Sequence, residues 1–268
     1  MKYQRVAFFA PALCLLLCTQ MGCVIRVVKG SGVEATDERT PAAFSALSNE
    51  TMLDVELVAG SEQLVRVTCD DNLLQYLKTE VRDGTLVIYQ PTVIDEPNTF
   101  LELQPSQNCL ATVTTDALSR VDNTGSGELR SDAAWPGLKR LSNTGSGGIR
   151  LTCGLQQLEE IENTGSGAVY AAGIVGAQLT TRLTGSGDVS LAGEVAVLDL
   201  EGTGSGKTLA RGLGVQRANV EITGSGGAEI HATDCVDITI TGSGNVHVAG
   251  NPRICSIDTP GSGEVIFD

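Results

Sequence analysis

The chain has 268 residues, of which 32 are glycine and only 4% are aromatic. Glycine inside a helix costs about 1 kcal/mol, so this composition excludes a mainly helical protein and favours many tight turns around small aliphatic side chains. The formal net charge of -14 excludes nucleic acid as a partner bound by electrostatic attraction.

Residues 1–22 have the pattern of an export signal. Lys2 and Arg5 precede an apolar stretch from Val6 to Cys18, which is shorter than the roughly 20 residues that span a membrane. A glycine then precedes Cys23, and this arrangement resembles the cleavage site of bacterial lipoproteins. The resemblance implies that Cys23 is acylated and anchors the protein in the cell envelope, at the outer membrane or cell surface. A conventional signal peptide without a lipid is the alternative.

Residues 23–42 follow as the lipidated cysteine and a polar tether, because this segment is rich in acidic side chains. Residues 43–117 contain short strand-like segments, a turn at Asp83-Gly84 and a helical turn near Leu73–Leu77. We interpret them as the irregular first coils of one domain, since the end repeats of a solenoid must cover its terminal core. The expected strands are Met52–Val58, Leu64–Thr68, Thr85–Tyr89, Thr99–Leu103 and Leu110–Thr114.

Eight copies of Gly-Ser-Gly recur at nearly constant intervals within residues 118–268. A short fixed period means that each repeat is one structural unit stacked on its neighbours. We expect the glycines to lie at bends, where positive φ and a narrow space favour them. They are Gly125, Gly127, Gly145, Gly147, Gly165, Gly167, Gly185, Gly187, Gly204, Gly206, Gly224, Gly226, Gly242, Gly244, Gly261 and Gly263.

Aliphatic side chains recur at three fixed offsets from the first glycine of each repeat, and all three offsets have the parity of one strand face. The sequence therefore predicts an all-β fold, a right-handed parallel β-helix (β-solenoid) with rungs of about 20 residues, because parallel crossovers are almost always right-handed. Four positions before the glycine stand Val121, Leu141, Ile161, Thr181, Leu200, Val220, Ile238 and Ile257. Four positions after it stand Leu129, Ile149, Val169, Val189, Thr208, Ala228, Val246 and Val265. Six positions after it stand Ser131, Leu151, Ala171, Leu191, Ala210, Ile230, Val248 and Phe267.

Polar residues form columns of their own. Threonine precedes the first glycine in seven repeats, serine lies between the glycines in all eight, and Asn123, Asn143 and Asn163 form a third column. Stacked amides and hydroxyls can hydrogen-bond along such columns. Outward-facing Thr and Ser would form a hydroxyl array suited to ice or a repeating sugar.

The chain stops at Phe267-Asp268, directly after the last predicted strand, and no charged cap segment follows. Unpaired strand edges invite pairing with another chain. The sequence therefore predicts an end-to-end homo-oligomer.

Five cysteines remain after Cys23, and they lack the CxxC spacing of zinc sites. Cys235 and Cys255 are one rung apart, which predicts a disulfide between stacked coils; export permits such bonds. Cys69 with Cys109 is a second predicted pair, and Cys153 is expected to be a buried free thiol.

Catalytic, metal and cofactor motifs are not evident. Calcium-binding β-rolls need an acidic group in each turn, whereas an acid follows Gly-Ser-Gly in only three of eight repeats. His231 and His247 are the only histidines, and we expect no metal site from them. A polysaccharide-acting β-helix enzyme remains an alternative, because acidic side chains are plentiful on the predicted exterior.

The order of motifs resembles a known family. Leu53-Asp54-Val55-Glu56-Leu57 and Thr79–Ile88, followed by repeated Thr-Gly-Ser-Gly, resemble the GIN domain family of auto-transporter adhesin head domains over about residues 36–268. The resemblance implies a secreted or surface-anchored β-solenoid without catalytic residues. We therefore expect a lipid-tethered module for adhesion or ligand display, with a glycan or surface protein as partner. An envelope scaffold without a ligand is the alternative.

Overall fold

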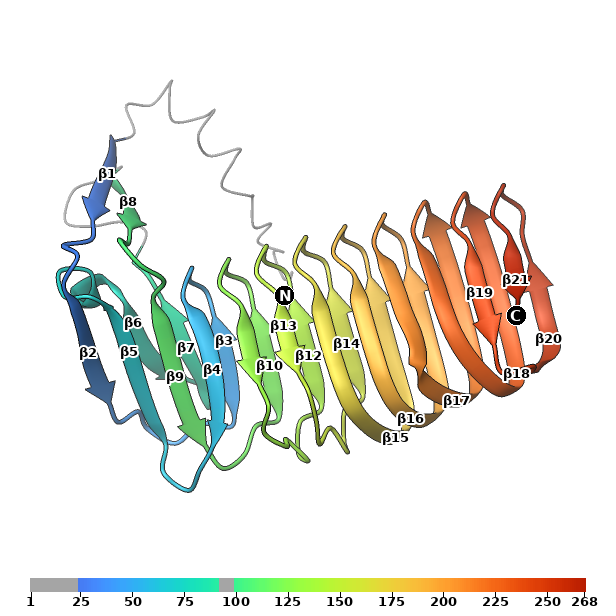
Figure 1. The fold of residues 1–268 in the computed structure, drawn as a ribbon, viewed down its shortest axis with the longest axis horizontal. Coiled ribbons are helices and arrows are strands. Elements are labelled where there is room, and N and C mark those ends of the chain that lie inside the picture. Colours follow the sequence, from blue (N-terminus) through green and yellow to red (C-terminus); the bar gives the residue numbers. More distant parts are fainter. Residues whose placement is uncertain (1–23, 92–98) are drawn as a thin grey trace, which may run out of the picture.

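The computed structural model describes residues 24–91 and 99–268 and forms an elongated stack of parallel strands (Figure 1). The predicted export signal and the lipidated Cys23 lie outside these residues and stay predictions. Val121 pairs with Leu141, and Leu141 with Ile161, each in parallel and one repeat apart in the chain. The predicted all-β parallel solenoid is therefore confirmed, with rungs of about 20 residues that each form one unit of the stack.

Each rung contributes one strand to each of two sheets that enclose the core. Strands of sheet A lead into the Gly-Ser-Gly corner, and strands of sheet B leave it. Sheet A consists, in spatial order, of β6 (Lys78–Arg82), β7 (Thr85–Tyr89), β3 (Ala46–Asn49), β10 (Arg120–Asn123), β12 (Arg140–Asn143), β14 (Glu160–Asn163), the second halves of β15 (Val169–Leu183), β16 (Val189–Gly202), β17 (Lys207–Gly224) and β18 (Gly227–Gly242), and β20 (Arg253–Asp258).

Sheet B begins with antiparallel pairs and continues with parallel ones. It consists of β2 (Glu34–Arg39), β5 (Leu64–Asp70), β9 (Leu110–Thr115), β4 (Asp54–Ala59), β11 (Leu129–Ser131), β13 (Ile149–Leu151), the first halves of β15 to β18, β19 (Val246–Ala249) and β21 (Val265–Phe267). At the corner opposite Gly-Ser-Gly, strands β15 to β18 run continuously from sheet B to sheet A through register shifts. These shifts act as β-bulges that bend each strand around the core.

The predicted columns fill this core. Every member of the three columns is buried up to Val248, whereas Ile257 and Phe267 of the last rung are exposed and Val265 is half-buried. Burying one aliphatic side chain contributes about 1.5–3 kcal/mol, so stacking supplies most of the stability of each rung.

Close approach between rungs, rather than positive φ, explains the corner glycines. Among them, only Gly224 and Gly242 have positive φ, so the expectation of positive φ at the other corners was wrong. A Cβ atom at Gly145 or Gly147 would lie within 3.0 Å of the carbonyl oxygen of Gly125 or Gly127, one rung earlier. The corner backbones therefore stack too closely for any side chain.

The predicted asparagine column is confirmed and begins one rung earlier than expected, at Asn49. All four asparagines are fully buried. The Nδ2 of Asn49 donates to Oδ1 of Asn123 at 3.1 Å, and Asn143 donates to Asn163 at the same distance. Asn163 also donates to the carbonyl oxygen of Gly167. The amides thus stabilise the corner from inside, where backbone groups would otherwise lack partners.

The expected polar tether is partly folded. Within residues 24–42, β1 (Val24–Lys29) pairs with β8 (Thr99–Gln104) in a separate two-stranded sheet, and β2 joins sheet B. Backbone pairing with β5 keeps the polar segment β2 in a strand although its side chains are mostly exposed. The predicted helical turn is a 3₁₀ helix, η1 (Leu74–Tyr76).

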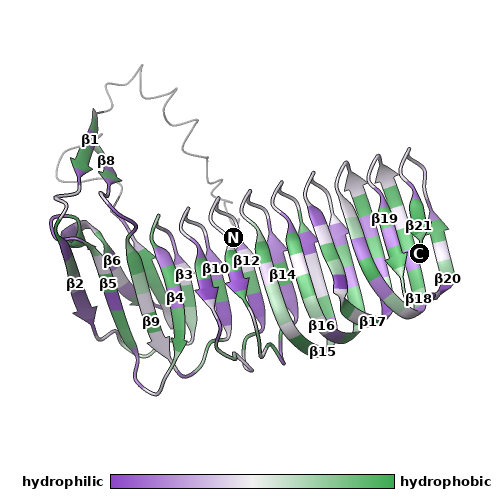
Figure 2. Ribbon diagram, viewed as in Figure 1, coloured by the Kyte–Doolittle hydropathy of each residue, from purple (hydrophilic) through white to green (hydrophobic). Residues whose placement is uncertain are grey.

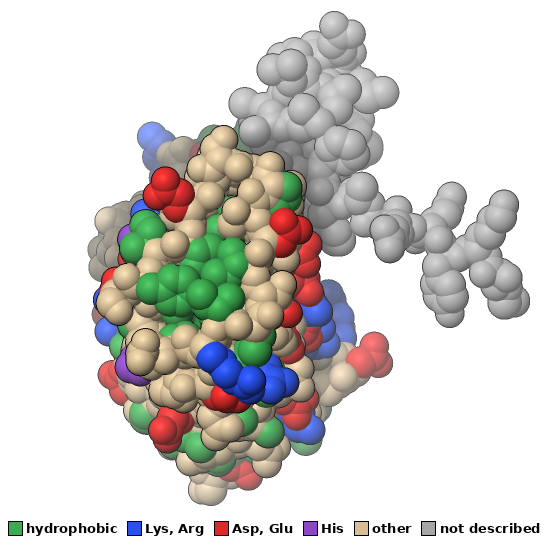
Figure 3. Space-filling view, turned by 90° about the vertical axis from the view of Figure 1, so that its right-hand side faces the viewer, with side chains coloured by type: hydrophobic (Ala, Val, Ile, Leu, Met, Phe, Trp, Pro, Cys, Tyr) green, Lys and Arg blue, Asp and Glu red, His purple; other side chains and the backbone are tan. Residues whose placement is uncertain are grey.

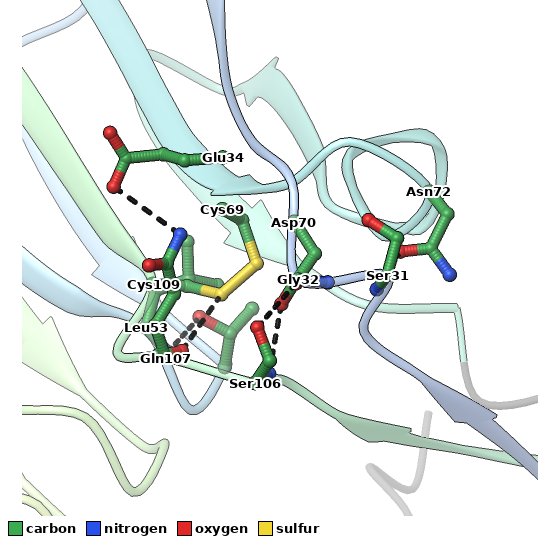
Figure 4. The surroundings of a disulfide bond; sticks show 11 residues. Ser31, Gly32, Glu34, Leu53, Cys69, Asp70, Asn72, Ser106, Gln107 and Cys109 are labelled. Carbon is green, nitrogen blue, oxygen red and sulfur yellow. Dashed lines mark hydrogen bonds between the residues drawn. A yellow bond between two sulfur atoms is a disulfide. The ribbon is translucent and has the colours of Figure 1, made fainter.

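A buried carboxylate fastens the amino-terminal end (Figure 4). Asp70 accepts hydrogen bonds from the backbone N–H of Gly32 at 2.7 Å and from the N–H and Oγ of Ser106 at 2.9 and 2.6 Å. These bonds, chiefly those from Ser106, lower the pKa of Asp70 below its ordinary value of 3.8. The neighbouring Cys69 and Cys109 are joined by a disulfide with a Cα–Cα distance of 4.5 Å. Three chain segments are therefore held at one point.

Replacing Gly147 by alanine should lower the free energy of unfolding by about 1–3 kcal/mol, because its Cβ would overlap the backbone of the preceding corner. Gly176→Ala is the matched control: its Cβ would have no neighbour closer than 3.9 Å. Denaturant unfolding followed by circular dichroism measures both. Equal stability of the two variants would contradict the close-approach explanation.

Asp70→Asn should destabilise the protein at neutral pH, because an amide NH₂ would face one of the N–H donors. Since folding lowers the pKa of Asp70, the carboxylate stabilises the fold above its ordinary pKa, and this contribution is lost as pH falls through the lowered pKa. The difference in melting temperature between wild type and Asp70→Asn should therefore shrink below about pH 4. Asp71→Asn, at an exposed neighbour, serves as control and should follow the wild type.

Candidate functional site

The outward face of sheet A carries a ladder of ion pairs that crosses several rungs. Arg140 contacts Glu160 at 3.0 Å and Glu162 at 2.7 Å. Arg182 in turn contacts Glu160 at 2.6 Å and Glu201 at 3.2 Å. Such exposed pairs contribute little stability individually, but together they hold long side chains in fixed positions on a rigid surface.

Asp122 lies at the amino-terminal end of this ladder, in β10. Its carboxylate contacts the Arg120 guanidinium at 2.9 Å, and its side chain is only 21% exposed. Burial raises the pKa of Asp122 above its ordinary value, although Arg120 and Arg140 oppose the shift. A half-buried acid beside an exposed arginine offers both an acceptor and donors to a polar ligand.

An open groove of about 640 Å³ lies over these residues. Its lining comes from the hairpin of β6 and β7 and from the strands β3 and β10. Only pairing between distant parts of the chain, β7 with β3 and β3 with β10, brings these elements together. Hydroxyl, carboxylate and guanidinium groups line it. The charged residues in the lining are Glu50, Arg82, Asp83, Arg120 and Asp122.

A second groove of about 330 Å³ crosses the same sheet nearer the carboxyl end. Its lining includes Asp199, Glu221 and Asp237. Asp199 accepts hydrogen bonds from Gln178 and from Asn219, the latter at 2.6 Å. Glu201 and Arg182 also line this groove, so it is mainly acidic, whereas the first groove has mixed charge.

The Gly-Ser-Gly corners form a ridge along one edge of both sheets. Their serines, and the threonines that precede the first glycine, are exposed in every repeat where they occur. The two hydroxyl columns therefore point outward, although the chain bends between them.

The structure places the predicted cysteines as follows. Cys235 and Cys255 are bonded between β18 and β20, with a Cα–Cα distance of 5.9 Å. Cys153 is a free thiol but is half-buried, so the expectation of burial was wrong. It lies in the turn after β13, and its Sγ is 3.1 Å from the carbonyl oxygen of Asp132.

The histidines do not converge on a site. His247 lies opposite Glu229 and His231 opposite Ala249 on neighbouring strands. Among the residues that the structure describes, no group of three or more His, Cys, Asp or Glu side chains could hold a metal ion. Within residues 24–91 and 99–268, no helix is long and apolar enough to cross a membrane.

The groove could not be predicted from the sequence, because its two sides come from separate parts of the chain. The alternation in residues 120–123 indicates that Arg120 and Asp122 face outward. No sequence signal places them beside Arg82 and Asp83.

Solved structures share this architecture. A "putative lipid binding protein" from Parabacteroides distasonis is 25% identical, with a TM-score of 0.77 over 91% of this chain and 100% of that one. A "putative adhesin" from the same organism is 21% identical, with a TM-score of 0.76 over 90% of this chain and 100% of that one. Another "putative adhesin", from Parabacteroides merdae, is 22% identical, with a TM-score of 0.74 over 90% and 99%. The two adhesins are evidence for the fold alone.

No curated protein matches the chain. The family described as "Putative auto-transporter adhesin, head GIN domain" matches residues 43–252. This range covers most of the chain and includes seven of the eight Gly-Ser-Gly corners. The chain therefore belongs to the GIN domain family.

Proposed function

We propose that this protein is a non-catalytic display module that is exported, tethered to the cell envelope through lipidated Cys23, and used for adhesion. The adhesin-like description of its family points to a surface or extracellular protein. The observation that carries the proposal is the groove of about 640 Å³ on sheet A. A glycan or a surface protein is the proposed ligand.

The chemistry of this groove suits a polar ligand. Its lining offers serine and threonine hydroxyls, carboxylates and two guanidinium groups. The residues that line it include no aromatic side chain, and the ring of Tyr89 on β7 is covered by Arg82 at 4.7 Å from the ring centroid. Recognition would therefore rest on hydrogen bonds and charge, which favour specificity and fast association over large apolar burial.

Rigidity favours binding as well. The groove floor consists of strands whose inward side chains are buried in the core, and ion pairs fix the outward ones. A ligand would therefore lose little affinity to ordering of the protein surface.

Arg120→Glu should weaken adhesion by about tenfold or more, because it reverses the charge at the centre of the groove. Attachment of cells that display the protein, together with binding to glycan arrays, measures the effect. Arg66→Glu is the matched control, since Arg66 pairs with Glu38 on sheet B and is similarly exposed.

Unchanged attachment in Arg120→Glu, or no attachment by the wild type, would favour the envelope scaffold without a ligand. Hydrolysis of a bacterial polysaccharide that disappears in Asp122→Asn would favour the enzyme alternative, with Asp122 as the acid.

Cys23→Ala should abolish incorporation of labelled palmitate and release the protein from the membrane fraction. Cys153→Ala should leave both unchanged, because Cys153 lies within the folded solenoid. Wild-type protein without label would refute the lipid anchor and leave the conventional signal peptide.

A further inference from the structure

The two ends of the solenoid differ in chemistry. At the amino-terminal end, the edge strands β2 and β6 carry the sequences Glu-Ala-Thr-Asp-Glu-Arg and Lys-Thr-Glu-Val-Arg. Figure 2 shows β2 as strongly hydrophilic. Charged side chains on an edge strand discourage pairing with another chain, so this end is protected.

The carboxyl-terminal end is apolar. Among the described strands, β20 pairs only with β18, and β21 only with β19. Ile254 is 58% exposed, Ile257 37% and Phe267 40%, whereas Ile238 and Val248 of the preceding rung are buried. Figure 3 shows a hydrophobic patch in the middle of this end, with charged side chains around it. The aliphatic columns of the core are therefore exposed to solvent at this end of the solenoid.

A disulfide keeps this edge in place. Cys255 of β20 is bonded to Cys235 of β18 across a sequence separation of 20. Closing this loop restricts the unfolded chain and so stabilises the folded state in the chain-entropy model. β20, the last strand of sheet A, is therefore fixed although it has a neighbour on one side only.

We propose that two copies of this chain associate tail to tail about a two-fold axis, with β20 of one copy antiparallel to β20 of the other. β20 is parallel to its neighbour β18 in sheet A, and a two-fold axis perpendicular to the sheet reverses the strand direction in the second copy. The two apolar patches then cover each other. The protected amino-terminal end makes head-to-tail stacking unfavourable.

The charges along β20 complement one another in this arrangement. The strand reads Arg253-Ile254-Cys255-Ser256-Ile257-Asp258. The register shift at Cys255 places the two isoleucines on one side and the two charged residues on the other. Strand reversal therefore brings Arg253 beside Asp258 of the second copy and Ile254 beside Ile257. Within one chain Arg253 contacts Asp234 at 3.1 Å, which leaves part of its guanidinium for a second carboxylate.

Sedimentation velocity of the purified protein tests this association. Wild type should pass from monomer to dimer as its concentration rises. Ile254→Asp should weaken dimerisation by about 100-fold or more, because the substitution buries a charge twice across the two-fold axis. Val175→Asp, at a similarly exposed valine on β15, should dimerise like the wild type. Circular dichroism checks that each variant is folded.

Charge reversal tests the antiparallel arrangement itself. Arg253→Asp and Asp258→Arg should each weaken self-association, because like charges then meet twice. An equal mixture of the two variants should dimerise again, since every Asp then faces an Arg. Parallel or head-to-tail contact would not give this rescue.

A strictly monomeric wild type, open-ended polymers, or a mixture that stays monomeric would each overturn the proposal. Binding of monomeric wild type to lipid vesicles that is lost in Ile254→Asp would assign the patch to a membrane surface instead. These outcomes are independent of ligand binding on sheet A, so the proposed adhesion function would be judged separately.

Discussion

The stack depends on how closely successive corners approach one another. A glycine of one corner lies against a glycine carbonyl of the corner before it, at a separation that excludes a Cβ atom. This contact brings the strands of neighbouring rungs into register, and register places aliphatic side chains above one another. The core, the asparagine column and the ion pairs on sheet A all follow from it.

The first corner, which has no glycine, is consistent with the same constraint. It carries Asn49-Glu50-Thr51-Met52-Leu53 where the next three rungs have Asn-Thr-Gly-Ser-Gly. Gly125 stacks on the carbonyl oxygen of Thr51, and Gly127 on that of Leu53. Within the described residues no earlier corner of this stack lies beneath Thr51, so a side chain fits there. A corner therefore requires glycine only where another corner precedes it in the stack.

Much of the fold could be predicted from the sequence because the repeat is local. The constant period determines which residues stack, and alternation determines which face inward; both predictions hold from Val121 to Val248. The amino-terminal part has no period, so the pairing of β2 with β5 and of β5 with β9 could not be deduced. The groove could not be deduced either, since Arg82 and Arg120 lie on β6 and β10, which only the pairing of β7 with β3 and of β3 with β10 brings close together. The reason for the glycines was predicted wrongly, because positive φ at a bend and close approach of two backbones both favour glycine. Only the positions of the neighbouring backbones distinguish these two explanations.

Residues 60–119 separate the rung of β3 and β4 from the rung of β10 and β11, and this separation affects the order in which the chain can fold. Later rungs connect residues one repeat apart, as Asn143 and Asn163 are, whereas Ser131 bonds to Leu57 across 74 positions. Closing the longer loop costs about 1 kcal/mol more in chain entropy. The repetitive rungs can therefore pair by short-range contacts, whereas β4 pairs only once the distant strands β9 and β11 are available. Val55 and Leu57 of β4, which are buried in the folded protein, stay exposed in that interval, so the amino-terminal rung completes its core later than the repetitive rungs do.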